Sequence, residues 1–180
     1  MDKFESDIKE ITKSQIPVSL SDLDVMRLVK GKAKVLLYKD LAKYNTIDEA
    51  LGKHGALYLL YEAKPMVGHW VTVFKRDDNT ISYFCSYGTF PDQQLYWNNQ
   101  YTRDYLGQNI PYLSYLLINS QYEKLEYNDF AFQKPGKDVA TCGRWAAMRL
   151  LLRELTPEEF IKAFRGVDGD YLVTLITEII

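Results

Sequence analysis

The chain is poor in the side chains that most often carry catalysis or bind metals. Its 180 residues include two cysteines, Cys85 and Cys142, and two histidines, His54 and His69. Neither cysteine belongs to a Cys-x-x-Cys pair, which argues against a disulfide framework and against a structural zinc site. So little cysteine is typical of a protein that works in a reducing compartment.

The chain also lacks a long apolar run and an excess of either charge. No stretch approaches the length of a membrane span, and the charged start, residues 1–7, has no apolar core of a signal peptide. We therefore expect neither a membrane partner nor secretion. The formal net charge of −2 gives no overall attraction to nucleic acid.

Apolar and aromatic residues are abundant. The hydrophobic fraction is 47%, with 14 tyrosines and 3 tryptophans, which is enough for the core of a domain of this length. We expect one domain over residues 1–180, in which residues 1–18 form a short helix and an N-terminal arm. The aromatic residues suit an ordinary core and also suit contacts with a peptide or protein.

Strand patterns occupy the middle of the chain and helical patterns its two ends, which predicts an α+β fold with a mostly antiparallel sheet flanked by helices. The continuous apolar run at residues 56–62 is typical of a central buried strand. The polar turn 76–79 joins two strands as a hairpin. The predicted strands are 35–38, 56–62, 69–75, 80–86 and 122–127.

Capping patterns mark where the helices begin. Capping boxes open helices at Ser21, Thr46 and Thr156. Further helices are predicted from Pro111 to Ile118 and from Tyr171 to Glu178, the last one capped by Asp170.

Cys142 lies at the predicted start of a helix that runs to Leu155, with Thr141 as its N-cap. Unpaired N–H groups and the helix dipole favour a thiolate there, so we expect a lowered pKa for Cys142. The next residue, Gly143, lets the backbone approach another group, such as a substrate. By position alone, an ordinary buried cysteine is the favoured interpretation of Cys142.

A reactive thiol needs a base and donors for an oxyanion. His54 lies in a turn and reads as an exposed residue, whereas His69 starts a strand and is the candidate base. Gln133 lies in the loop that leads into the Cys142 helix, and its side-chain amide is a candidate oxyanion donor. Taken alone, Gln133 reads as a solvated loop residue.

Together these segments resemble the adenovirus-type and SUMO-protease-type cysteine proteases, and within that group the maturation proteases of large DNA viruses and virophages. The resemblance rests on Gly68-His69-Trp70, on the segment from Tyr83 to Gly88, on Gln133, and on Thr141-Cys142-Gly143. The chain order is histidine, acid, glutamine, cysteine, whereas papain-like enzymes place the cysteine first. The resemblance covers about residues 17–155.

The resemblance implies an adenain-like fold, with Cys142 as nucleophile, His69 as general base and Gln133 in the oxyanion hole. It also implies that Trp70, Gly143 and Ser86 contact the substrate, with Trp70 walling a narrow entry that suits glycine. The chain departs from the family at Cys85, which stands where an aspartate usually orients the histidine. A thiol carries no reliable charge.

Without that acid, the enzyme would work as a Cys–His dyad, or another group would orient His69. Ser86, a backbone carbonyl and a water molecule are candidates, and Asp92 is a weaker one. We expect a slower enzyme than a full triad would give.

The resemblance implies a monomeric viral cysteine endopeptidase that processes capsid or other virion precursors at glycine-containing sites, in the virion and the host cell. It implies no metal and no cofactor. Some relatives are activated by DNA or a peptide, but the net charge gives no support for DNA. Three alternatives remain open: a protease for ubiquitin-like modifiers, an acyltransferase, and a non-catalytic binding module.

Overall fold

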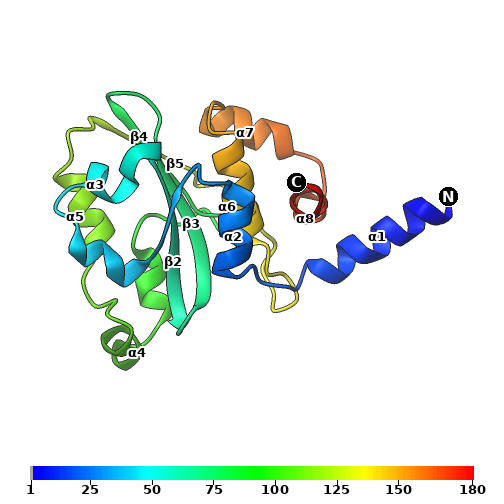
Figure 1. The fold of residues 1–180 in the computed structure, drawn as a ribbon, viewed down its shortest axis with the longest axis horizontal. Coiled ribbons are helices and arrows are strands. Elements are labelled where there is room, and N and C mark those ends of the chain that lie inside the picture. The colour runs from blue at the N-terminus through cyan, green and yellow to red at the C-terminus, as the bar shows by residue number, and fades with distance from the viewer. Residues whose placement is uncertain (1) are drawn as a thin grey trace.

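The computed structural model describes residues 2–180, and a five-stranded sheet forms its centre (Figure 1). The strands follow chain order across the sheet. They are β1 Lys34–Leu37, β2 Ala56–Lys64, β3 Val67–Lys75, β4 Thr80–Phe84 and β5 Lys124–Tyr127.

The sheet is mixed, which corrects the expectation of a mostly antiparallel one. β2, β3 and β4 are antiparallel, whereas both edge strands run parallel to their neighbours. Parallel neighbours need long connections that return the chain to the same end of the sheet. Residues 38–55 and 85–123 are such connections.

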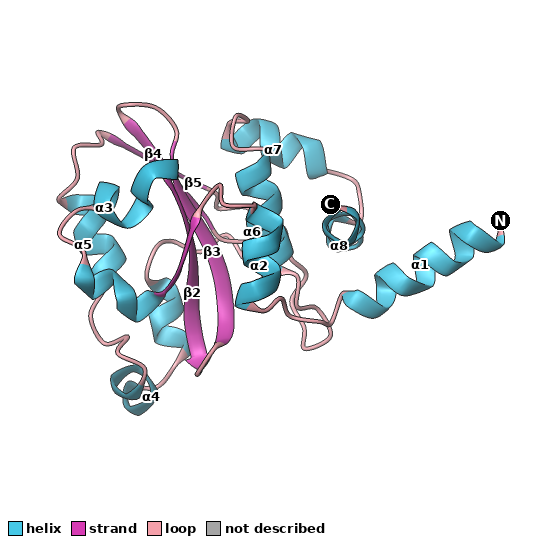
Figure 2. Cartoon of the chain, viewed as in Figure 1, coloured by secondary structure: helices cyan, strands magenta, loops and turns pink. Residues whose placement is uncertain are grey.

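Helices cover both faces of the sheet (Figure 2). In Figure 1, α3 and α5 lie on one side, whereas α2 and α6 lie on the other, with α7 and α8 beyond them. The α-helices are α1 Lys3–Gln15, α2 Asp22–Val29, α3 Ile47–Leu51, α4 Gln100–Tyr105, α5 Tyr112–Ile118, α6 Cys142–Leu151, α7 Pro157–Phe164 and α8 Gly169–Ile179; the 3₁₀ helices are η1 Tyr38–Lys43, η2 Gly52–His54 and η3 Gln93–Trp97.

Strand β2 is buried on both faces, as its apolar run predicts. Leu57 and Leu59 join the core under α3 and α5, whereas Tyr58 and Leu60 join the core under α2 and α6. A third apolar cluster, centred on Trp145, packs α6 against α7 and α8. The helix that begins at Cys142 is therefore enclosed between the sheet and the two C-terminal helices.

The predicted boundaries are correct at several ends and wrong at others. The capping boxes at Ser21 and Thr156 are complete. Thr46 accepts the N–H of Glu49, but the Glu49 carboxylate accepts from the N–H of Asn45, so this box is altered.

Three elements, β4, β5 and α6, are shorter at one end than predicted. Strand β4 ends at Phe84, two residues early, and β5 begins at Lys124 rather than at residue 122. Helix α6 ends at Leu151 rather than at residue 155. η3 and α4, whose sequences carry no strong periodicity, were not predicted.

Residues 3–15 form a helix, as expected, and α1 projects away from the sheet while contacting α8 (Figure 1). None of the helices described in residues 2–180 is both long and apolar enough to span a membrane.

Candidate active site

His69 is placed by a glycine next to the turn of the β2–β3 hairpin. Gly68 pairs with Glu62 where the register of the two strands shifts. A Cβ atom at position 68 would overlap the carbonyl oxygen of Tyr61, so only glycine fits. The next residue, His69, turns its ring toward a cavity and is 7% exposed.

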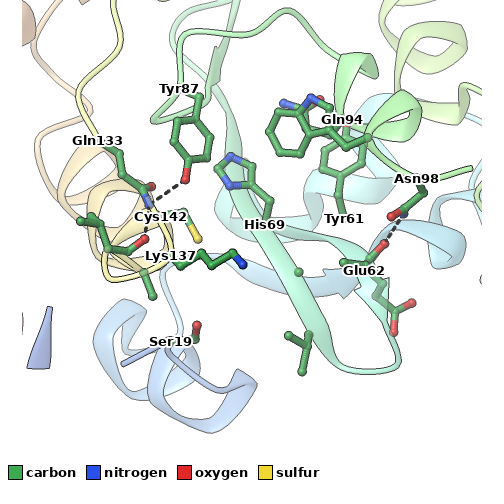
Figure 3. A pocket seen from close by; sticks show the side chains of 16 residues that line it. Ser19, Tyr61, Glu62, His69, Tyr87, Gln94, Asn98, Gln133, Lys137 and Cys142 are labelled. Carbon is green, nitrogen blue, oxygen red and sulfur yellow. Dashed lines mark hydrogen bonds between the residues drawn. The ribbon is translucent and has the colours of Figure 1, made fainter. Parts of the chain in front are cut away.

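Three side chains surround the His69 ring, and Figure 3 shows one of them, Tyr87, beside it. Its Nε2 lies 3.2 Å from the Sγ of Cys85. The Tyr87 ring stacks on it at a centroid distance of 5.1 Å, and Trp97 approaches edge-on at 5.2 Å. The ring is thus held by packing and by one polar contact.

Cys85 does stand beside the histidine, at the position where the resemblance calls for an acid. The Thr89 hydroxyl donates to Cys85 Sγ at 3.0 Å, and Gln94 Nε2 donates to Thr89 Oγ1 at 2.7 Å. Both hydrogen bonds are donated in the direction of the Cys85 sulfur, from Gln94 to Thr89 and from Thr89 to Cys85. The direction of the contact between Cys85 and His69 Nε2 depends on the imidazole tautomer; in the tautomer whose Nε2–H donates to the sulfur, Nδ1 keeps its lone pair.

The other two side chains considered for orienting His69 are engaged elsewhere. Asp92 accepts from the hydroxyls of Tyr38 at 2.7 Å and Tyr61 at 2.9 Å, and from the N–H of Ser114 at 2.8 Å. Ser86 is fully buried and donates to Gln133 Oε1 at 2.9 Å. Neither of them contacts the imidazole, and Ser86 does not line the cavity.

Cys142 is the first residue of α6, as predicted, but its helix is not capped as predicted. Thr141 makes no side-chain cap; its hydroxyl donates to Asp170 Oδ1 at 2.5 Å. Asp170 is not the cap of α8 either, because that helix begins at Gly169 after Asp168.

Asp170 is instead a buried carboxylate that joins three segments. It accepts from the Thr141 hydroxyl, from Trp145 Nε1 at 2.9 Å, and from the N–H of Lys134 at 3.0 Å. Helix α8 thereby holds both the start of the Cys142 helix and the loop that follows Gln133.

Burial determines the protonation of the Cys142–His69 pair. It raises the pKa of the Cys142 thiol to about 11, although the backbone N–H groups of Trp70 and Gly143 oppose that rise. It also lowers the pKa of His69 to about 3, because a buried imidazolium loses its hydration. At neutral pH both groups are uncharged. The expected lowering of the Cys142 pKa, which would favour a resting thiolate, is therefore wrong: desolvation outweighs the helix start.

Gln133 lies in the same region, and every polar atom of its side chain has a partner. Its Oε1 accepts from Ser86, and its Nε2 donates to the Tyr87 hydroxyl and to the Val139 carbonyl, each at 3.1 Å. The backbone N–H of Gln133 also donates to the carbonyl of Ser86 at 3.0 Å. The loop is thus fixed to the segment that follows β4.

A cavity of about 630 Å³ brings these groups together. Cys142, His69, Gln133 and Tyr87 all line it, and Trp97 forms part of its wall. Its remaining lining residues are Ser19, Tyr61, Glu62, Ala63, Val67, Gly68, Gln94, Asn98, Lys137, Val139 and Ala140.

Trp70 and Gly143 do not line this cavity, although their backbone N–H groups lie near the Cys142 sulfur. Trp70 packs edge-on against Tyr58 and donates from Nε1 to the carbonyl of Leu20. It lines a neighbouring cavity of about 190 Å³, which shares Ser19, Val67 and Gly68 with the larger one. A Cβ atom at position 143 would lie 3.1 Å from Trp70 Cδ1. Gly143 therefore packs closely against Trp70 and Leu20, and a side chain at this position would push one of them aside by a few tenths of an ångström.

Sequence reasoning missed Tyr87, Thr89 and Trp97 as site residues. Tyr87 and Thr89 lie in the turn after β4, close to Cys85 in sequence, so proximity to the motif was a usable signal. Trp97 comes from η3, which no local pattern predicted, and only the fold brings it to His69. His54 is exposed, as expected.

The chain is therefore an α+β protein in which a buried cysteine at a helix start, a histidine and a glutamine share one cavity. No family model matches the sequence. The chain is 46% identical over 166 residues to protein V9 of the Sputnik virophage, an uncharacterized protein, and the match covers 89% of this chain and 94% of V9. The chain belongs to the same family as V9, which bears out the virophage part of the resemblance.

Proposed function

We propose that this chain is a viral cysteine endopeptidase that processes capsid or other virion precursor proteins. One observation carries the proposal. Cys142, His69 and Gln133, separated in sequence, line a single cavity, with Cys85 beside Nε2 of the imidazole. Their order along the chain is that of the adenovirus-type proteases. Kinship with a virophage protein supports a viral setting.

The reaction starts from a neutral pair. A bound peptide displaces water from the cavity, and Cys142 Sγ attacks the scissile carbonyl carbon while its proton moves to His69 Nδ1. The carbonyl oxygen becomes an oxyanion, which N–H and O–H donors stabilise. The C–N bond then breaks, and the imidazolium returns its proton to the leaving amine.

A thioester on Cys142 remains. Water attacks this thioester while His69 takes one of its protons, and the tetrahedral species collapses to release the carboxylic product and the thiol. The oxyanion and the imidazolium form only during these steps, because the thiol and the imidazole are neutral before the attack. A Cys–His pair that is neutral at rest therefore predicts a slow enzyme, whose imidazolium has a thiol rather than a carboxylate beside it.

Glycine at the cleavage site is part of the proposal. Tyr87 and Trp97 flank the histidine and restrict the space beside it. A residue without a side chain passes such a constriction most easily. The family resemblance implies cleavage beside glycine. The restricted space between Tyr87, Trp97 and His69 supports that expectation.

The test is co-expression of the chain with candidate virion proteins, followed by mass spectrometry of new termini. We expect new termini beside glycine with the parent chain and none with Cys142→Ala. Cys85→Ala is the matched control, because it also removes a buried thiol but leaves Cys142 in place. Identical termini with parent and Cys142→Ala would refute the proposal.

The same assay distinguishes the nearest alternative. Ubiquitin-like modifiers also end in glycine, so a conjugate of such a modifier is included as a second substrate. Cleavage of the conjugate without cleavage of virion precursors would reassign the target while keeping the chemistry.

A further inference from the structure

The side-chain amide of Gln133 has both N–H groups engaged in hydrogen bonds within the protein. The donor to an oxyanion in this site is therefore a different group. A primary amide has two N–H donors. Here one reaches the Val139 carbonyl and the other reaches the Tyr87 hydroxyl. Its oxygen accepts from Ser86. Gln133 thus has no N–H left for a substrate in this arrangement.

The Tyr87 hydroxyl, in contrast, has a proton to give. It accepts from Gln133 Nε2 at 3.1 Å, and among residues 2–180 it makes no other hydrogen bond. Figure 3 shows this hydroxyl directed toward the Gln133 amide, on the side of the ring where Cys142 lies. Tyr87 lines the cavity together with Cys142 and His69.

Two further properties make Tyr87 a suitable donor. Its ring stacks on His69, so the hydroxyl is held relative to the base. Its pKa is raised by burial and by the nearby Cys142 and Cys85 sulfurs, so the phenol stays protonated at neutral pH. Tyrosine hydroxyls are among the groups that serve in oxyanion holes.

We propose that the Tyr87 hydroxyl donates the hydrogen bond that stabilises the oxyanion, and that Gln133 is the positioning residue that holds and polarises it. The proposal rests on the proposed function. As Cys142 Sγ bonds to the carbonyl carbon, the C=O π electrons move onto oxygen, which accepts from Tyr87 O–H. When the C–N bond breaks, the pair returns and the hydrogen bond weakens.

Tyr87→Phe is the decisive variant, because it removes the hydroxyl and keeps the ring that stacks on His69. Removing one oxyanion donor typically costs about 10²- to 10³-fold in kcat. We expect a loss of that order in kcat with little change in KM. A peptide aldehyde, whose hemithioacetal carries the same oxygen, should bind about 10²-fold more weakly. Tyr122→Phe is the matched control, because its hydroxyl contacts Asp48 outside the cavity.

Alkylation of Cys142 by iodoacetamide separates this role from a structural one. That displacement creates no oxyanion, so Tyr87→Phe should alkylate at the parental rate, which also shows that the site is folded. If alkylation slows as much as cleavage does, Tyr87 acts by positioning His69, and the proposal is wrong.

A double-mutant cycle tests the part assigned to Gln133. If Gln133 acts through Tyr87, Gln133→Ala should slow the parent strongly and the Tyr87→Phe variant hardly at all. Equal losses in both backgrounds would show that Gln133 donates directly, and would overturn the proposal. So would a parental kcat for Tyr87→Phe.

Failure of the proposed function looks different. In that case the parent chain itself cleaves no precursor and binds no aldehyde, although Cys142 is alkylated. That result would reject both the proposed function and the oxyanion role of Tyr87. A parent that cleaves, beside a Tyr87→Phe variant that cleaves equally well, rejects Tyr87 alone.

Discussion

Cys85 contacts the imidazole of His69 and Cys142 shares a cavity with it, and the surroundings of the two cysteines differ. Cys85 has no exposed surface, and its sulfur contacts His69 Nε2 and the Thr89 hydroxyl. Cys142 is 8% exposed, begins a helix and lines a cavity of about 630 Å³. The same side chain is enclosed in one place and accessible in the other.

The comparison shows that residue type does not determine the chemistry of a thiol. A nucleophile needs access, nearby donors and a base with a free lone pair. Cys142 has the cavity and the backbone N–H groups of Trp70 and Gly143 near its sulfur. Cys85 contacts Nε2 of the histidine and has no opening to solvent.

The largest expected difference between the two cysteines is in cleavage. Cys142→Ala should lower kcat by a factor on the order of 10⁴ or more, as loss of a nucleophile does. Cys85→Ala should retain activity within about tenfold, because it removes an orienting contact only. Steady-state kinetics on a peptide spanning a mapped site measures both. Comparable losses in the two variants would contradict the distinction.

The second prediction concerns pH. Because burial puts the pKa of Cys142 at about 11, its thiolate fraction should rise about tenfold per pH unit from pH 7 toward that value. Iodoacetamide alkylation, followed by mass spectrometry of each cysteine peptide, should show this slope at Cys142. Cys85 should stay unmodified in the folded chain.

A plateau in the Cys142 rate that begins near pH 5 would show a resting thiolate–imidazolium pair. It would contradict the neutral resting state.

Asp170→Asn is the third prediction. The asparagine oxygen can still accept from Thr141 and Trp145, but its NH₂ group then faces the N–H of Lys134. The loop after Gln133 should loosen, and kcat should fall by about 10- to 100-fold, since misplacement of about 1 Å costs that much. Hydrogen exchange over residues 133–140 should become faster.

Asp168→Asn is the control for that variant, because Asp168 makes an exposed ion pair with Lys134 Nζ at 2.9 Å on the same helix start. Such pairs contribute little. Unchanged hydrogen exchange of residues 133–140 in Asp170→Asn would show that Asp170 does not hold this loop.

The smallest expected effect is a gain. Cys85→Asp places a carboxylate beside His69 Nε2, where it stabilises the imidazolium that forms during attack. We expect activity equal to the parent or up to roughly tenfold higher, which one unit of pKa would give. Kinetics with a thermal melt as the fold control measures this. A large loss of activity with an unchanged melt would show that position 85 is not the acid position.

Short-range features were predictable from the sequence because a few adjacent residues encode them. The β2 strand follows from its apolar run, and the cap at Thr156 follows from the positions of Pro157 and Glu159. The place of Cys142 as the first residue of a helix was also predictable. These features depend on backbone geometry and on local hydrogen bonds.

The edges of the sheet were less predictable. A local pattern identifies a strand, but it does not state which neighbour that strand will join. The parallel pairing of β1 and β5 results from where residues 38–55 and 85–123 return the chain. Those segments contain η1, η3 and α4. Tertiary packing, rather than a local sequence pattern, determines these short helices.

The sequence by itself determined the candidate residues Cys142, His69, Gln133 and Cys85, because residue type and chain order carry that information. Only the tertiary structure decided how they are used. In the folded chain the Thr141 hydroxyl donates to Asp170 instead of capping its helix, and the Tyr87 ring stacks on His69. Burial, which no local pattern reports, makes the resting thiol and imidazole neutral, since transfer from water disfavours each charge.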